Sequence, residues 1–160
     1  MSRTTPRSFY ALFVAPNFYD YLDDPTDIRR GFNASVSAFQ LADIMYAFYK
    51  KNDPSKISLW PKKRDLLIDL GKRERLFITI QSVATAYKHL YTDGAHYEVA
   101  SRGPARISVP TRKTELESAE AYNSKGDVIV RRLDGTEVSL TAALTAVVNN
   151  LWPSVLPSEI

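Results

Sequence analysis

The stretch that decides the fold is DPTDIRRGFNASVSAFQLADIMYAFYKKNDP, residues 24–54. It opens with residues that favour a helix start, because Asp24 can cap and Pro25 suits the first helical turn. Asp27 adds negative charge near the positive end of the helix dipole. The closing Asn-Asp-Pro cannot continue a helix. The stretch therefore predicts one long helix that ends at about residue 51.

One face of this helix is apolar, since Phe32, Val36 and Phe39 recur at i, i+4 and i+7. Asp43 continues the same face, so we expect a largely buried carboxylate there. An isolated buried charge is costly, and Asp43 must therefore be paired or hydrogen-bonded. The pairing is interpreted as a structural tie rather than a catalytic group. Candidate partners are Arg73, Arg75, His89 and a tyrosine hydroxyl.

The rest of the chain adds shorter elements. KISLWPKKRDLLIDLG, residues 56–71, predicts a linker and a helix with Pro61 near its start and Gly71 as its stop or kink. RERLFITIQSVATAYKHL, residues 73–90, predicts a further helix. After residue 94 the pattern changes to the short β-rich runs HYEVAS and RISVP, and then to DVIVRRLDGTEVSL.

The Asp134-Gly135 pair suits a tight hairpin turn between the two β-rich runs that flank it. Ser139 or Thr141 could cap a terminal helix that Pro153 ends. The prediction is an α+β fold: an N-terminal helical bundle, a small antiparallel sheet and a C-terminal helix. Residues 1–160 form a single domain, with a helical part at 24–92, a small β part at 95–140 and the terminal helix at 141–152.

Composition limits the chemistry. The chain has no cysteine, which excludes disulfides and zinc–thiolate sites and suits a reducing cytoplasm. No apolar run reaches the roughly 18 residues of a membrane span, and the apolar patch FYALFVA near the start reads as part of the fold rather than a signal peptide. We therefore expect a cytoplasmic protein with no membrane partner. Single scattered glycines and the lack of a G-x-S-x-G motif give no sign of a cofactor.

His89 is the first candidate catalytic residue, at the end of SVATAYKHLYTDG. With Asp93 and His96 it offers the ligand types of a non-haem iron centre, but nothing in the spacing makes the three converge, and no metal site is predicted. We interpret His89 as a structural residue at a helix C-terminus, where a cation is favoured by the helix dipole. In an enzyme it would work instead with Arg29, Arg30 or Asn33 of the first helix, and Lys88 is a further candidate catalytic residue.

A basic segment is the second candidate. Residues 50–92 carry ten Lys and Arg against four Asp and Glu, a net charge of +6. Cations beside an aromatic ring are typical of single-stranded nucleic-acid binding. An ordinary solvated surface, with opposite charges one turn apart, explains the same pattern. The residues that would contact RNA or DNA are Lys56, Trp60, Lys62, Lys63 and Arg64.

The long helix also resembles the first helix of a HEPN-like group of small uncharacterised bacterial proteins. The group's Asn-Ala-x-x-Ser/Thr-Ala-aromatic-His-Leu-x-Asp pattern is matched, with Gln40 in place of the histidine, at Asn33, Ala34, Ser37, Ala38, Phe39, Leu41 and Asp43. IQSVATAYKHL is similar to the group's later helix through Lys88 and His89, with Ser82 and Thr85 where the group has Asp and Asn. The hairpin followed by a Trp-ended helix is similar to its C-terminal part.

This resemblance implies a helical bundle, often dimeric, of bacterial, phage or mobile-element origin. The ribonuclease branch of that superfamily uses an Arg four to six residues from the His, whereas the nearest upstream Arg here is Arg75. Nuclease activity is therefore not implied.

The leading hypothesis is a non-enzymatic binding or assembly module. The alternatives are an RNA-binding or RNA-processing protein that uses His89 with the first helix, and a small-molecule binder with a pocket lined by Phe39, Tyr46 and Trp60.

Overall fold

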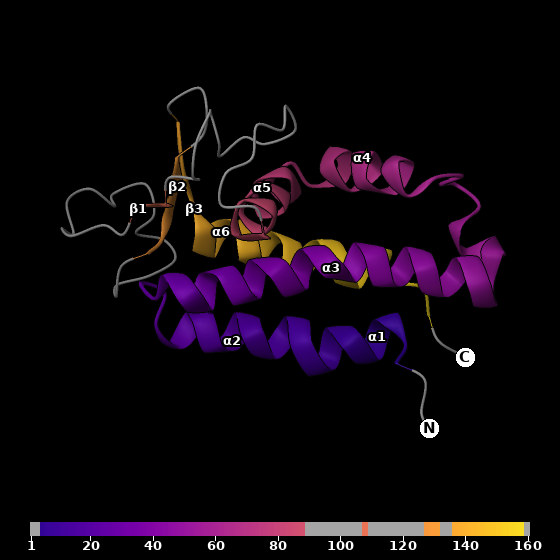
Figure 1. Cartoon of the computed structure of the whole chain (residues 1–160), viewed down its shortest axis with the longest axis horizontal. Coiled ribbons are helices and arrows are strands. Elements are labelled where there is room, and N and C mark those ends of the chain that lie inside the picture. The colour runs from indigo at the N-terminus through magenta and orange to yellow at the C-terminus, as the bar shows by residue number, and fades with distance from the viewer. Residues whose placement is uncertain (1–3, 89–106, 109–126, 132–135, 159–160) are drawn as a thin grey trace.

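The computed structural model describes residues 4–88, 107–108, 127–131 and 136–158, and most of these are helical (Figure 1). The helical elements are α1 (Pro6–Phe9), the π-helical turn η1 (Tyr10–Val14), α2 (Ala15–Asp23), α3 (Ile28–Asn52), the 3-10 turn η2 (Pro54–Ile57), α4 (Lys63–Arg73), α5 (Leu76–Lys88), α6 (Leu140–Thr145), the π-helical turn η4 (Ala146–Leu151) and α7 (Trp152–Val155). A small antiparallel sheet consists of β1 (Ile107–Ser108), β2 (Ile129–Arg131) and β3 (Glu137–Ser139). The predicted combination of helices, a small antiparallel sheet and a C-terminal helix is confirmed.

The long predicted helix is α3, but it begins later than expected. Asp27, not Asp24, is the N-cap, and its Oδ1 accepts hydrogen bonds from the backbone N–H groups of Arg29 at 2.9 Å and Arg30 at 3.2 Å. Asp24 instead stabilises the turn before the helix, because its Oδ1 accepts from the Thr26 hydroxyl at 2.7 Å. An aspartate can cap a turn as well as a helix, so sequence alone did not distinguish the two positions.

The inner face of α3 is lined by small residues that let other helices approach closely. Ala34, Ala38 and Ala42 are fully buried. A Cβ added at Gly31 would lie 2.8 Å from a methyl of Leu140 in α6 and 3.3 Å from the ring of Tyr21 in α2. Glycine weakens a helix interior by about 1 kcal/mol relative to alanine, so the close packing of α2 and α6 explains its presence here. α3 also packs against α5, and the core therefore surrounds it.

Trp152 joins the C-terminal helices to this core. Its indole N–H donates to the carbonyl of Ala38 at 3.0 Å, and its ring meets Phe77 of α5 edge-on with the centroids 6.1 Å apart. The sequence predicts that Pro153 ends the helix, which is wrong. Pro153 is the second residue of α7, and the helix continues past it to Val155.

The π-helical turn η4 comes directly before that proline and changes which backbone groups are paired. In η4 the backbone N–H of Trp152 donates to the carbonyl of Val147, five residues back. The next donor in this pattern would be Pro153, which has no N–H, so the carbonyl of Val148 is left without a helical partner. The hydroxyl of Tyr10, within the π-helical turn η1, donates to this carbonyl at 2.9 Å. The tyrosine therefore links the two ends of the chain while completing a helix hydrogen bond.

Arg7 forms a second link between the two ends. Its Nε donates to the carbonyl of Pro157 at 2.7 Å, and its Nη2 donates to that of Leu156 at 2.9 Å. α1 and the residues that follow α7 therefore lie side by side at one end of the molecule (Figure 1).

The predicted hairpin pairing is present in β2 and β3, where Val130 faces Val138 in antiparallel register. The predicted turn at Asp134-Gly135 lies outside the described residues, as does the run HYEVAS. The run RISVP contributes β1, in which Ile107 pairs with Val130. Ser139, one of the two predicted caps, is the N-cap of α6 and accepts from the backbone N–H of Ala142 at 3.0 Å.

Replacing Tyr10 with phenylalanine tests the link across the π-helical turns. The substitution keeps the ring but leaves the Val148 carbonyl without its donor, so the free energy of unfolding should fall by about 1 kcal/mol in urea titrations. Tyr19→Phe, at a side chain that is 58% exposed, is the matched control and should leave stability unchanged. Equal stability of the two variants would contradict a role for the hydroxyl.

Candidate functional site

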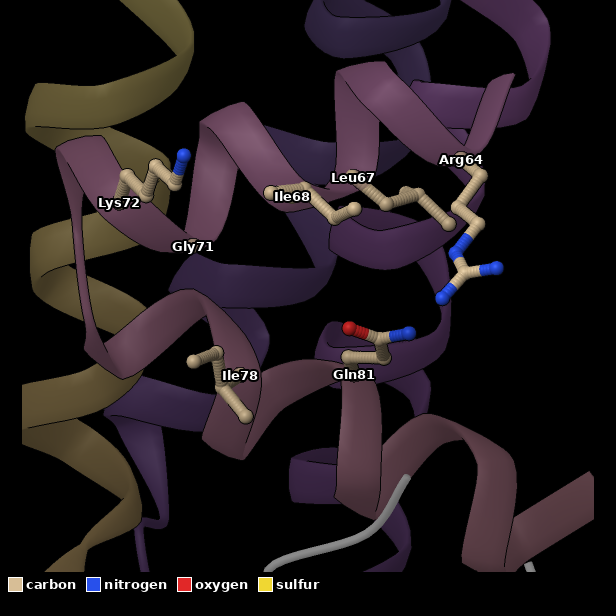
Figure 2. A pocket seen from close by; sticks show the side chains of 7 residues that line it. All are labelled: Arg64, Leu67, Ile68, Gly71, Lys72, Ile78 and Gln81. Atoms are coloured by element: carbon tan, nitrogen blue, oxygen red, sulfur yellow. The ribbon is translucent and has the colours of Figure 1, made fainter. Parts of the chain in front are cut away.

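A groove between α4 and α5 combines apolar side chains with charged ones. The cavity holds about 570 Å³. Its floor and walls come from both helices, and Figure 2 shows Leu67 and Ile68 of α4 across from Ile78 and Gln81 of α5. The lining residues are Arg64, Leu67, Ile68, Gly71, Lys72, Ile78 and Gln81.

Local sequence explains why α4 presents this face. The backbone N–H of Lys62 donates to Asp65 Oδ2 at 2.9 Å, which fixes the start of the helix. Leu66 and Leu70, four residues apart, are fully buried and attach α4 to the core. Leu67 is partly buried against the same core, whereas Ile68, two residues after Leu66, lies on another side of the helix. Ile68 consequently remains 46% exposed, so α4 is apolar on more than its buried side.

Gly71 lies inside α4 and does not end it, contrary to the prediction of a stop. A Cβ at this position would lie 3.1 Å from Cγ1 of Ile78, which is tight. The missing side chain lets α4 and α5 approach each other at one end of the groove and leaves the groove open beside it. α4 ends instead at Arg73, and the backbone N–H of Glu74, the C-cap residue, donates to the carbonyl of Leu70 at 2.9 Å.

Two cations stand at the edge of this groove. Arg64, Ile68 and Lys72 succeed one another at four-residue intervals, so they share one face of α4. Both charged side chains are exposed, and in the part of the chain that the structure describes neither has an acidic partner. Figure 2 shows Arg64 extending from α4 toward Gln81. A second hollow of about 390 Å³ adjoins Ile68 and Lys72 and includes Leu59, which is 77% exposed.

The nucleic-acid candidates divide into two groups. Lys56, Lys62, Lys63 and Arg64 are exposed on η2 and at the start of α4. Trp60 is not available to stack on a base, because it is 8% exposed and its indole N–H donates to Asp69 Oδ2 at 2.9 Å. Asp69 also accepts from Nε of Arg73 at 2.9 Å. Burial of the aromatic ring removes one of the two features that predicted nucleic-acid binding.

Asp43 is paired, as expected, but the prediction that it is largely buried is wrong. Its side chain is 48% exposed, and Oδ1 lies 3.0 Å from Nζ of Lys63, a distance typical of an ion pair. Oδ1 itself is shielded from solvent and has no partner in hydrogen-bond geometry. Neither Arg73 nor Arg75 is the partner, because η2 turns the chain and brings the start of α4 over this part of α3.

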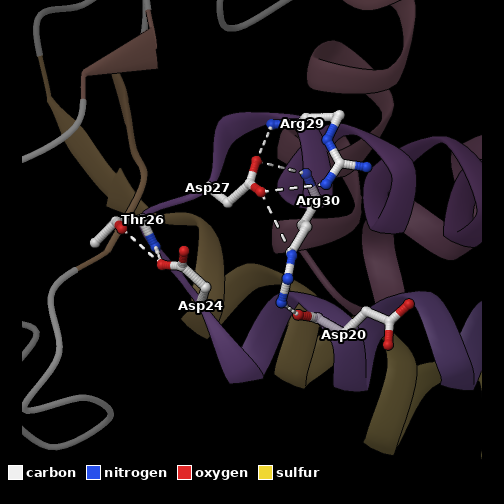
Figure 3. Close-up of polar contacts among 6 residues, drawn as sticks. All are labelled: Asp20, Asp24, Thr26, Asp27, Arg29 and Arg30. Atoms are coloured by element: carbon white, nitrogen blue, oxygen red, sulfur yellow. Dashed lines mark hydrogen bonds and ion pairs between the residues drawn. The ribbon is translucent and has the colours of Figure 1, made fainter.

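Arg29 and Asn33, candidates for an enzymatic site, do come together. Both line a polar hollow of about 240 Å³ at the junction of α2 and α3, with Asn17, Asp20, Asp23 and Arg30. The arginines have local partners (Figure 3): Asp27 Oδ2 lies 3.5 Å from Nη2 of Arg29, and Nη1 of Arg30 donates to the carbonyl of Asp20 at 2.9 Å. This network ties the end of α2 to the start of α3.

Lys88 is the last residue of α5, whereas His89, Asp93 and His96 lie outside the described residues. The predicted placement of His89 near the first helix stays a prediction. Within the described ranges, no group of three or more His, Cys, Asp or Glu side chains is placed to hold a metal ion.

The proposed small-molecule pocket does not form from the three residues named for it. Phe39 packs against the Phe77 ring with centroids 6.1 Å apart, and the Tyr46 hydroxyl donates to the carbonyl of Pro61 at 2.8 Å. With Trp60, these side chains contribute to the hydrophobic core rather than to a shared opening.

A buried polar cluster was missed by the sequence analysis. Asp127, 1% exposed, accepts at Oδ1 from the Tyr21 hydroxyl at 2.9 Å and from the hydroxyl and backbone N–H of Thr141 at 2.8 and 3.2 Å. Its Oδ2 accepts from the Ser139 hydroxyl. Burial, together with the Asp127 carboxylate, raises the pKa of Tyr21 above its ordinary value of 10.0. The cluster joins α2, a residue two positions before β2, and the start of α6.

Comparisons with family models, with curated proteins and with solved structures found no match to the chain. None of the helices in the described ranges has the length and hydropathy needed to cross a bilayer.

The buried cluster predicts how stability responds to alkaline pH. In the unfolded chain Tyr21 loses its proton near pH 10, whereas the folded protein holds that proton to higher pH. Its contribution to stability is therefore complete below pH 10 and is lost as pH rises toward the folded-state pKa. Above pH 10 the free energy of unfolding of the wild type should fall with pH, and Tyr21 should account for up to roughly 1.4 kcal/mol of this fall per pH unit. In Tyr21→Phe this part of the slope should be missing.

Urea titrations between pH 8 and pH 11 would measure this slope. Thr141→Val is the control, because it weakens the same cluster but retains the tyrosine, and it should keep the alkaline slope. Identical slopes for wild type and Tyr21→Phe would show that Tyr21 is not the group responsible.

The half-exposed ion pair between Asp43 and Lys63 should contribute little to the free energy of unfolding. A double-mutant cycle of Asp43→Asn and Lys63→Met should give a coupling energy of about 0.2–1 kcal/mol that shrinks with added salt. Lys62→Met, at an exposed neighbour that has no ion pair among the described residues, is the control. A coupling above about 2 kcal/mol would indicate the buried tie that the sequence predicts.

Proposed function

We propose that this protein is a non-enzymatic binding module that holds an apolar segment of a partner protein in the groove between α4 and α5. The observation that carries the proposal is the groove itself: a hollow of about 570 Å³ with Leu67, Ile68 and Ile78 on its walls and charged residues only at its edge. Recognition grooves commonly combine apolar walls with a few polar groups that fix orientation.

The packing of α4 supports this function. A surface helix that only covered the core would direct its apolar residues to one side. Here Leu66 and Leu70 already make that attachment, whereas Ile68 and the neighbouring Leu59 remain exposed. Apolar side chains gathered beside a groove mark an interaction site more often than apolar side chains scattered singly.

The RNA-binding alternative rests on the exposed cations of η2 and α4, and the burial of Trp60 weakens it. A HEPN-like origin in bacteria or mobile elements, and a homodimer, stay predictions that the helical fold is compatible with. A role for His89 stays a prediction as well.

Selection of peptides from a random displayed library on the immobilised full chain tests this function. Enriched peptides should bind wild type at least tenfold more tightly than Ile68→Ser, because burying an isoleucine contributes about 1.5–3 kcal/mol and tenfold is 1.4 kcal/mol. Leu12→Ser, at an exposed leucine of η1, is the matched control and should bind like wild type. Anisotropy titrations would supply the affinities.

Failure to enrich any peptide, or enrichment of peptides that bind Ile68→Ser and wild type equally, would contradict a binding groove at this place. Titrations with single-stranded and double-stranded RNA at low salt test the alternative, which predicts an affinity that falls steeply as salt is added.

A further inference from the structure

The backbone N–H and C=O groups of a bound segment need hydrogen-bond partners, and this need limits which conformation the segment can have in the groove. Both walls are helices, α4 and α5, whose backbone groups are engaged in their own hydrogen bonds. The side chains between them are mainly apolar, namely Leu67, Ile68 and Ile78. An extended peptide would therefore find no strand edge here to pair with, and its own N–H and C=O groups would lose hydrogen bonds to water. A helix satisfies its backbone internally and avoids that cost.

The charges at the edge limit the occupant further. Arg64 and Lys72 are eight residues apart on one face of α4, about 12 Å along its axis at 1.5 Å per residue. Ile68 lies midway between them, so a cation, an apolar residue and a second cation follow one another along this face of α4. A helix lying along α4 would present the complementary order if two of its carboxylates were seven or eight residues apart with apolar side chains between them.

We propose that the partner segment is an acidic amphipathic α-helix, whose apolar stripe packs between α4 and α5 and whose carboxylates pair with Arg64 and Lys72. This inference rests on the proposed function and adds the chemical class and the conformation of the partner.

A nucleic acid fits the same surface less well. Between the two cations the groove offers aliphatic side chains, which do not stack on bases as aromatic rings do. Asp65 and Asp69 lie on the same helix beside Ile68 and Lys72, around the adjoining hollow. These carboxylates would repel a phosphate backbone that followed α4. Two isolated acidic groups of a helix can reach the cations without passing over the aspartates.

Synthetic peptides of about 18 residues, long enough to form a helix on binding, provide the test. The parent peptide has leucines at i, i+3, i+4 and i+7 and two glutamates eight residues apart. A second peptide carries lysines for these glutamates, and a third has a central proline. Each is titrated by anisotropy against wild type, against the double variant Arg64→Glu/Lys72→Glu, and against the control Lys50→Glu/Lys51→Glu, which makes the same charge change on exposed residues of α3.

Wild type and the Lys50/Lys51 control should bind the parent peptide alike, and the Arg64/Lys72 variant at least tenfold more weakly. The lysine peptide should bind the Arg64/Lys72 variant more tightly than it binds wild type. The proline peptide should lose binding. Circular dichroism should show the parent peptide gaining helicity in the complex.

Four results would overturn the inference. Undiminished binding of the proline peptide would indicate an extended occupant, and insensitivity of the parent peptide to the Arg64/Lys72 variant would exclude the charge pairing. Binding of single-stranded RNA that this variant abolishes, with no binding of the parent peptide, would assign the cations to a nucleic acid. If library peptides depend on Ile68 but carry no acidic residues, the binding groove stands and only the acidic helix is overturned.

Discussion

The fold depends on how closely other helices can approach α3. Its inner face carries Gly31, Ala34, Ala38 and Ala42, and larger side chains there would push α2 and α6 away. Interiors are packed as densely as organic crystals, so even a methyl group at Gly31 would require movement of Leu140 or Tyr21. The same closeness lets the Trp152 indole reach the Ala38 carbonyl and lets the Tyr21 hydroxyl reach Asp127. The long polar connections across the core therefore follow from short side chains on one helix.

Much of the fold could be predicted because its signals are local. The periodicity of α3 and α5 and the two β-rich runs around Asp134-Gly135 predict helices and an antiparallel pair that the structure contains. The errors occurred where tertiary contacts decide. Pro153 continues a helix because a π-helical turn precedes it and Tyr10, far away in sequence, supplies the missing donor. The N-terminal helices were not predicted, since Pro16 interrupts their pattern in the same way.

The candidate site was less predictable, because it depends on which side of a helix faces outward. The charge of the basic segment is evident from the sequence, but Trp60 cannot stack on a base, because it is buried and its indole N–H donates to Asp69. Lys63 was not foreseen as the partner of Asp43, because twenty residues and the turn η2 separate them. Leu66 and Ile68 lie on different sides of α4 and both are apolar, so the sequence gives no sign of which of these sides is buried. The Asp127 cluster lacked any signal beyond a carboxylate before a β-rich run.

The pairing of Arg7 with the carbonyls of Leu156 and Pro157 has a consequence for how the protein can be attached to other objects. Figure 1 places α1, which carries Arg7, on the other side of α3 from α4. A tag, a surface tether or a fused domain added beyond either end of the described residues would therefore be attached close to Arg7, on the side of α3 opposite α4. A short linker could also join these ends covalently, and a circularly permuted chain could then be opened at an exposed turn elsewhere without separating the helices that build the groove.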